Sequence, residues 1–249
     1  MSRSFLGFLG FCLLLALVTA GVVWYMGPAL AAIVVDGERR ENPYYLLQML
    51  PRAAVVGDNA DPSYRARFVT LAAEDDARLL WQGGAADVAE GSILLDVAGA
   101  QLLEFASGAD LVQMFTSSAY RALDSAVGTL PVRQVGSATE PLPLAPDRAT
   151  VIVFYRADEG AGALPLGRAG EGGWLRLLPD YGGDVRWDAE VDVIRSGGNW
   201  SRVLLLQFVD VAAAASWLAD PATVTERAIA AKNVDALTAI IVQPGAPRL

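Results

Sequence analysis

Along residues 65–137, segments with the apolar pattern of strands alternate with segments whose apolar residues recur at helical spacing. Four stretches have the short apolar or alternating pattern of strands: residues 65–73, 91–99, 101–107 and 130–137. Residues 75–84 read as a helix that ends at Gly83-Gly84, as helices often do. Residues 109–128 place apolar side chains at helical spacing. The predicted order is β-α-β-β-α-β.

The same order returns after residues 138–148, a stiff Pro-rich linker. Four further strands are expected at residues 150–157, 185–195, 200–210 and 235–244. Helices are expected at residues 174–183, ending at Gly182-Gly183, and at residues 212–233. A Gly-rich insertion, residues 158–173, reads as a surface loop.

Residues 102–118 align without gaps on residues 205–221, which indicates an internal repeat. Leu102, Leu103 and Phe105 fall on Leu205, Leu206 and Phe208. Each β-α-β-β-α-β unit is ferredoxin-like, with helices on one face of its sheet. The other face must be covered. We therefore expect the two bare faces to stack as a single-chain pseudo-dimeric α/β barrel.

Residues 5–26 are uncharged and long enough to cross a bilayer as a helix. A cleaved signal peptide ending before Gly21 is the alternative, but apolar sequence continues beyond that point. The predicted fold class is α+β, with an N-terminal transmembrane helix before the two repeats. A short N-terminal tail usually stays inside, so we expect a single-pass protein of the bacterial inner membrane with a periplasmic domain.

Six segments follow from these patterns. They are a transmembrane anchor (1–35), a juxtamembrane connector (36–64), a first ferredoxin-like repeat (65–137), the Pro-rich linker (138–148), a second repeat (149–244) and a tail (245–249). Within the connector, residues 42–52 read as a short amphipathic helix that stops at Pro51.

Composition excludes several classes of function. The net charge is −9, which disfavours nucleic-acid partners. The chain has no histidine, and its one cysteine, Cys12, lies in the N-terminal apolar run. Histidine-based triads, His-ligated zinc or haem, and a cysteine nucleophile in the repeats are therefore excluded. We predict no cofactor and no metal.

Two stretches carry a resemblance to a known family. Residues 181–183 (Tyr-Gly-Gly), a strand ending at residues 197–198 (Gly-Gly) and the strand after it resemble the bacterial family called domain of unknown function 1330. Ser117, Tyr120 and Leu123 match that family's Ser-x-x-Tyr-x-x-Leu helix ending. The second repeat departs from it, with Thr223 opposite Tyr120.

The resemblance implies membership of the dimeric α/β-barrel superfamily. Relatives in that superfamily include cofactor-free monooxygenases, muconolactone-isomerase-like proteins and haem-binding chlorite dismutases. The haem branch is disfavoured, because this chain has no histidine to serve as the proximal ligand.

Four residues are candidates for a pocket. Glu104 lies among Leu and Phe on a predicted central strand, where a carboxylate can act as a base, and its repeat counterpart is Gln207. The alternative is that Glu104 faces solvent or pairs with an arginine such as Arg133. Tyr155 ends a strand beside the 158–173 loop. No catalytic residue is assigned.

Asp188, Glu190 and Asp192 alternate with apolar residues and so share one face of a strand. Three carboxylates on one face suggest a cation site. Charges on the solvated face of an edge strand explain them better, because such charges discourage aggregation.

Two functions remain. The first is a membrane-anchored, non-catalytic binding or interaction module, an accessory subunit whose partners are the membrane and other proteins of a membrane complex. The alternative is a cofactor-free monooxygenase- or isomerase-like enzyme that acts on a small hydrophobic substrate. The alternative rests on fold analogy.

Overall fold

The computed structural model describes residues 27–51, 62–90, 97–124, 132–157, 173, 175–196, 200–230 and 234–244. The expected membrane helix at residues 5–26, Gly21 and Cys12 lie outside this set. No helix within it is long and apolar enough to cross a membrane. The predicted fold class, with its N-terminal transmembrane helix, is corrected: the described chain is a mixed α/β fold built on antiparallel strands.

Helix α2, Pro28–Val35, shows the reason for part of that correction. The sequence interpretation assigned these apolar residues to the anchor, but the helix has eight residues and spans about 12 Å, too short for a hydrocarbon core of about 30 Å. Its Leu30 and Ile33 are instead buried in the protein core. Helix α3, Gly37–Glu41, follows, capped by Asp36.

The first half of the barrel spans residues 44–137, so it begins inside the predicted connector. Its elements are β1 Tyr44–Pro51, α4 Pro62–Glu74, β2 Ala77–Glu90, β3 Val97–Phe105, α5 Gly108–Thr116, α6 Ser118–Asp124 and β4 Val132–Ser137. The order is β-α-β-β-α-β, but four predictions were wrong. Residues 42–52 contain a strand, residues 65–73 form a helix, and residues 75–84 lie mostly in a strand. Strand β3 also runs unbroken past residue 100, where a break between two strands was expected.

Burial explains two of these corrections. In α4, the buried residues Tyr64, Phe68, Leu71 and Ala72 recur at helical spacing, and the weak alternation over residues 65–73 does not correspond to burial. In β1 both faces are buried, so the strand shows no alternation at all.

The second half spans residues 149–244. Its elements are β5 Ala149–Ala157, the 3-10 helix η2 Leu178–Tyr181, β6 Asp184–Glu190, β7 Asp192–Ser196, β8 Arg202–Phe208, α7 Val211–Ala219, α8 Pro221–Ala230 and β9 Val234–Pro244. The first helix of this half is therefore shorter than predicted, and the second is split where Asp220 accepts hydrogen bonds from the first amides of α8.

The two glycine pairs have different roles. Gly182 ends η2 with a left-handed backbone (φ 64°), so the pair at residues 182–183 ends a helix, as the sequence indicates. Gly83 and Gly84 lie within β2, so that prediction was wrong. The left-handed turn before β2 is made by Asp76, which has φ 56°.

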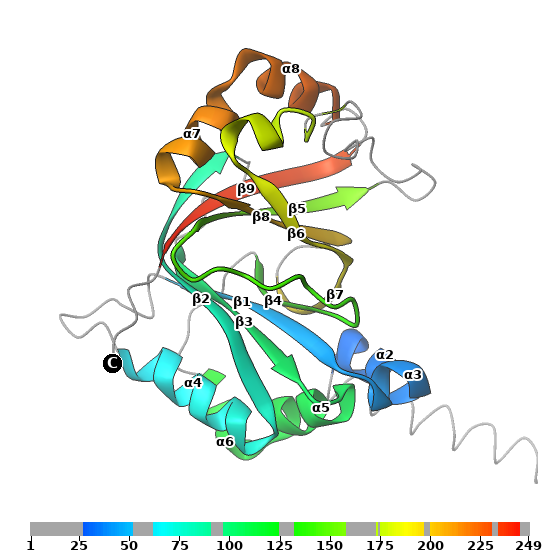
Figure 1. The fold of residues 1–249 in the computed structure, drawn as a ribbon. Coiled ribbons are helices and arrows are strands. Elements are labelled where there is room, and N and C mark those ends of the chain that lie inside the picture. Colours follow the sequence, from blue (N-terminus) through cyan, green and yellow to red (C-terminus); the bar gives the residue numbers. More distant parts are fainter. Residues whose placement is uncertain are drawn as a thin grey trace, which may run out of the picture.

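One continuous sheet forms the centre of the molecule (Figure 1). Within the described residues its strand order is β6-β8-β5-β9-β2-β3-β1-β4-β7. Only Val191 separates the two end strands, β6 and β7, in the chain. The sheet therefore closes on itself, and each half contributes a ferredoxin-like order, β2-β3-β1-β4 or β6-β8-β5-β9.

The core has three layers. The barrel interior holds apolar side chains from both halves, among them Leu47, Leu102, Ile152 and Leu205. Helices α4, α5 and α6 cover the outer face of the first half, and α7 and α8 cover that of the second (Figure 1). The fold is an α/β barrel formed by two ferredoxin-like halves of one chain.

Candidate functional site

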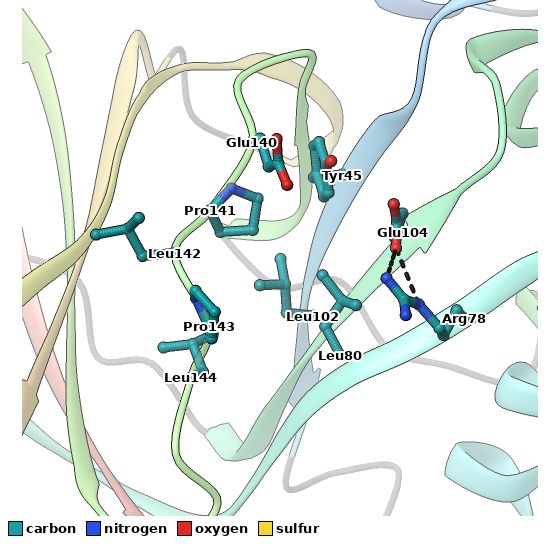
Figure 2. A pocket seen from close by; sticks show the side chains of 10 residues that line it. All are labelled: Tyr45, Arg78, Leu80, Leu102, Glu104, Glu140, Pro141, Leu142, Pro143 and Leu144. Carbon is teal, nitrogen blue, oxygen red and sulfur yellow. Dashed lines mark hydrogen bonds and ion pairs between the residues drawn. The ribbon is translucent and has the colours of Figure 1, made fainter.

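A pocket of about 300 Å³ opens between the first half of the barrel and the linker at residues 138–148, which we call the strap. Figure 2 shows the strap facing strands β1, β2 and β3 across it. The pocket is lined by Tyr45, Arg78, Leu80, Leu102, Glu104, Glu140, Pro141, Leu142, Pro143 and Leu144. Six of the lining residues are Leu or Pro, and the other four are polar: Tyr45, Arg78, Glu104 and Glu140 (Figure 2).

Strand register places the polar groups of the first half side by side. Glu104 on β3 pairs with Tyr45 on β1 and with Arg78 on β2. Side chains directly opposite one another on neighbouring strands point to the same face. Tyr45 and Leu102 belong to the barrel-interior core, so this face is the inner one.

Glu104 and Arg78 form an ion pair. Glu104 Oε2 accepts hydrogen bonds from Arg78 Nε at 3.0 Å and from Arg78 Nη2 at 2.5 Å (Figure 2). The Glu104 side chain is 22% exposed and the Arg78 side chain 73%. Arg78 therefore takes the place that the sequence suggested for Arg133. The backbone of Arg133 lies in β4, and its side chain is outside the described set.

Tyr45 supplies a neutral hydroxyl to the pocket. Burial raises its pKa, the carboxylates of Glu104 and Glu140 raise it further, and the Arg78 guanidinium opposes them. The phenol therefore stays protonated at neutral pH and can donate a hydrogen bond.

Gln207 occupies the equivalent place in the second half but has no pocket role there. It is fully buried and bonded to the strap: its Oε1 accepts from the Ala145 amide, and its Nε2 donates to the Ala145 carbonyl, both at 2.9 Å. Two more bonds hold the strap on β6. The Leu142 amide donates to the Arg186 carbonyl, and the Trp187 indole donates to the Thr139 carbonyl.

Tyr155 lies apart from the other candidates. It packs in the outer core of the second half, with Leu178 and Leu204. Burial raises its pKa to about 12, and Arg202 opposes the shift. The structure thus brings Glu104 to the pocket but leaves Tyr155 and Gln207 out of it.

Arginines engage two of the three carboxylates that suggested a cation site. Asp188 accepts from Arg202 at 2.7 Å. Asp192 accepts from Arg39 at 2.8 Å and from the Tyr44 hydroxyl. Across the described ranges, no group of acidic, His or Cys side chains could hold a metal ion.

Sequence reasoning missed Tyr45, Arg78 and the strap. The sequence pattern places Tyr45 and Arg78 in helices, and only the correct strand register brings them beside Glu104. The prolines of the strap indicate a spacer in the sequence, whereas Pro141 and Pro143 form part of the pocket wall.

Comparisons with known proteins identify no family. No family model matches the sequence, and no curated protein matches it. An anthrone oxidase-like protein is similar in structure, with a TM-score of 0.47 and 12% identity over 84% of this chain and 97% of its own. A proposed monooxygenase from Fusobacterium nucleatum has a TM-score of 0.43 and 8% identity, over 81% and 92% of the two chains. A mutant chlorite dismutase from Candidatus Nitrospira defluvii has a TM-score of 0.44 and 9% sequence identity, and the match covers 84% of this chain and 96% of the dismutase.

These findings correct the leading functional prediction. The prediction of a membrane-anchored, non-catalytic module is set aside, because the described chain holds no membrane-spanning helix and the similar structures carry oxidase, monooxygenase and dismutase names. At TM-scores below 0.5, the likeness carries no argument about the reaction of this chain.

Proposed function

We propose that the protein is a cofactor-free monooxygenase- or isomerase-like enzyme that removes a proton from a small hydrophobic substrate, with Glu104 as the base. One observation carries the proposal: a pocket of about 300 Å³, lined by Leu and Pro side chains on its other walls, that reaches a carboxylate oriented by an arginine. This volume lies at the lower end of the range for small-molecule sites.

The arrangement suits proton abstraction next to a carbonyl group. Arg78 holds Glu104 Oε2, which leaves Oε1 as an acceptor for the substrate's proton. The Tyr45 hydroxyl can donate a hydrogen bond to the oxygen on which negative charge develops.

Three predictions from the sequence stay predictions. They are the finer resemblance to domain of unknown function 1330, the inner-membrane location with a periplasmic domain, and partners in a membrane complex. The last two depend on residues 1–26, which lie outside the described residues.

Anthrone is a suitable probe, because its acidic C–H group is conjugated to a ketone. Base removes this proton, and the carbanion reacts with O₂ to give anthraquinone and water, so one O₂ is consumed per anthrone. Glu104→Gln should lower the rate by about 10²–10⁴-fold, the usual contribution of a general base. Oxygen uptake and anthraquinone absorbance measure the rate, and C–H exchange in D₂O without O₂ measures the proton step alone.

Glu190→Gln is the matched control, because Glu190 is an exposed carboxylate on β6 outside the pocket. It should keep the full rate. Equal rates of oxygen uptake and of C–H exchange in the Glu104→Gln and Glu190→Gln proteins would contradict the proposal.

A further inference from the structure

Two pairs of residues occupy equivalent positions in the two halves. The pair in the first half lines the pocket, and the pair in the second half lies beside the strap. Glu104 on β3 pairs with Tyr45 on β1, and Gln207 on β8 pairs with Thr150 on β5. Three residues after each, Ser107 and Asp210 cap the next helix. Glu104 therefore corresponds to Gln207, and Tyr45 to Thr150.

In the second half, this place is occupied by the protein's own backbone. Gln207 Oε1 accepts from the Ala145 N–H and Gln207 Nε2 donates to the Ala145 C=O, each at 2.9 Å. Gln207 Nε2 also lies 3.3 Å from the Thr150 hydroxyl. The Gln207 side chain thus binds the strap as it would bind a ligand, because it hydrogen-bonds both the N–H donor and the C=O acceptor of Ala145.

The Ala145 backbone that Gln207 binds presents a donor and an acceptor at a fixed spacing. The N–H and C=O groups of one residue are joined through a single carbon, as H–N–C–C=O. An α-hydroxy ketone has the same arrangement, H–O–C–C=O, with a hydroxyl in place of the amide N–H. In the first half, Glu104 and Tyr45 both line the pocket, so Glu104 Oε1 can accept a hydrogen bond and the Tyr45 hydroxyl can donate one to a ligand there.

We propose that the pocket takes a small α-hydroxy ketone with apolar substituents, held by Glu104 and Tyr45 as the Ala145 backbone is held by Gln207. This inference rests on the proposed function of the pocket and names its substrate class. The apolar substituents would lie against the walls formed by Leu80, Leu102 and the strap. The pocket binds one molecule per chain, because Ala145 fills the equivalent place.

The reaction that follows is an isomerisation. Glu104 takes the proton of the hydroxyl-bearing carbon, the C–H electron pair forms the C=C bond of an enediolate, and the carbonyl π pair moves to its oxygen beside Tyr45. Glu104 then returns the proton to the former carbonyl carbon, and the hydroxyl proton passes to the other oxygen. Hydroxyl and carbonyl exchange places, and no oxidant or cofactor is consumed.

Benzoin and deoxybenzoin form a matched pair of probes, because they differ only in the hydroxyl group. Calorimetry on the full chain should show benzoin binding at least tenfold more tightly, with one molecule per chain. Racemisation of one benzoin enantiomer and exchange of its α-hydrogen in D₂O report proton abstraction, since its isomerisation regenerates benzoin.

Two variants separate binding from proton transfer. Glu104→Gln removes the base but keeps a group that can hydrogen-bond the ligand hydroxyl, so it should keep the preference for benzoin within about threefold and lose racemisation. Glu104→Leu should lose both. Circular dichroism checks that each variant is folded, and the isosteric Glu104→Gln is the variant expected to fold in any case.

The possible failures are distinguishable. Equal affinity for benzoin and deoxybenzoin, or more than one benzoin per chain, would overturn the α-hydroxy ketone inference even if anthrone turnover depends on Glu104. A Glu104-dependent preference for benzoin without racemisation, exchange or anthrone turnover would support the ligand class and overturn the enzymatic proposal.

Discussion

Asp76 and Gly182 show how single residues shape the turns before β2 and β6. Both have a left-handed backbone, φ 56° and φ 64°, which costs an L-residue more than glycine. Asp76→Gly should therefore raise the free energy of unfolding by about 0.5–1 kcal/mol, after the extra entropy that glycine gains in the unfolded chain. Gly182→Ala should lower it by about 1 kcal/mol or more, since its Cβ would also lie 3.2 Å from Val209 Cγ1. Urea denaturation measures both.

Asp76→Ala serves as the control, because it keeps a side chain in the same exposed turn. It should leave stability unchanged or lower it. If Asp76→Gly were no more stable than Asp76→Ala, left-handed strain at this turn would not be the cause.

At this same scale, the sequence shows why Glu104 is a candidate: it is a polar side chain among Leu and Phe on a predicted central strand. The structure places it in the lining of the pocket, and its role there stays a prediction. Tyr45 could not be found in this way. It lies in a strand whose two faces are both buried, so no alternation indicates which residues share a face with Glu104.

At the scale of elements, the outer face of the first sheet carries a polar row that the second lacks. Gln101, Gln48 and Gln134 are in register on β3, β1 and β4 and are fully buried. Gln101 Nε2 donates to Gln48 Oε1, and Gln48 Nε2 donates to the Tyr64 hydroxyl at 3.0 Å. In the second half, Leu204 and Val153 hold the places of Gln101 and Gln48.

This row predicts a non-additive response to mutation. Gln48→Val alone removes the acceptor of the buried Gln101 amide and should cost about 1–3 kcal/mol. The double variant Gln48→Val/Gln101→Leu copies the second half, so it should cost less than the sum of the single variants. A double-mutant cycle by urea denaturation measures the difference, expected at about 0.5–3 kcal/mol. Strict additivity would mean that the two amides do not stabilise each other.

The position of the row was not predictable from the sequence. The pattern of residues 42–52 predicts a helix, and the glutamines meet only when β1 and β3 are paired in register. Periodicity identifies β5 and β8 more easily, because long runs of β-branched and aliphatic residues there are typical of buried strands.

At the scale of the whole molecule, the two halves share one core. Side chains from β1 and β3 pack in the barrel interior with side chains from β5 and β8, and the pairs β2–β9 and β4–β7 join the sheets. Neither half can bury its inner face without the other. The chain should therefore unfold as one cooperative unit, although its sequence is a repeat of two.

Phe68→Ala and Phe208→Ala test this shared core. Phe68 is buried in the outer core of the first half and Phe208 in that of the second. Each change should cost about 3–5 kcal/mol and shift a single transition. Hydrogen-exchange mass spectrometry should show peptides from β3 and β8 losing protection together in both variants. If Phe68→Ala lowered protection only in the first half, the halves would be separate folding units, and the strap that joins them across the pocket would be a linker between domains rather than part of one barrel.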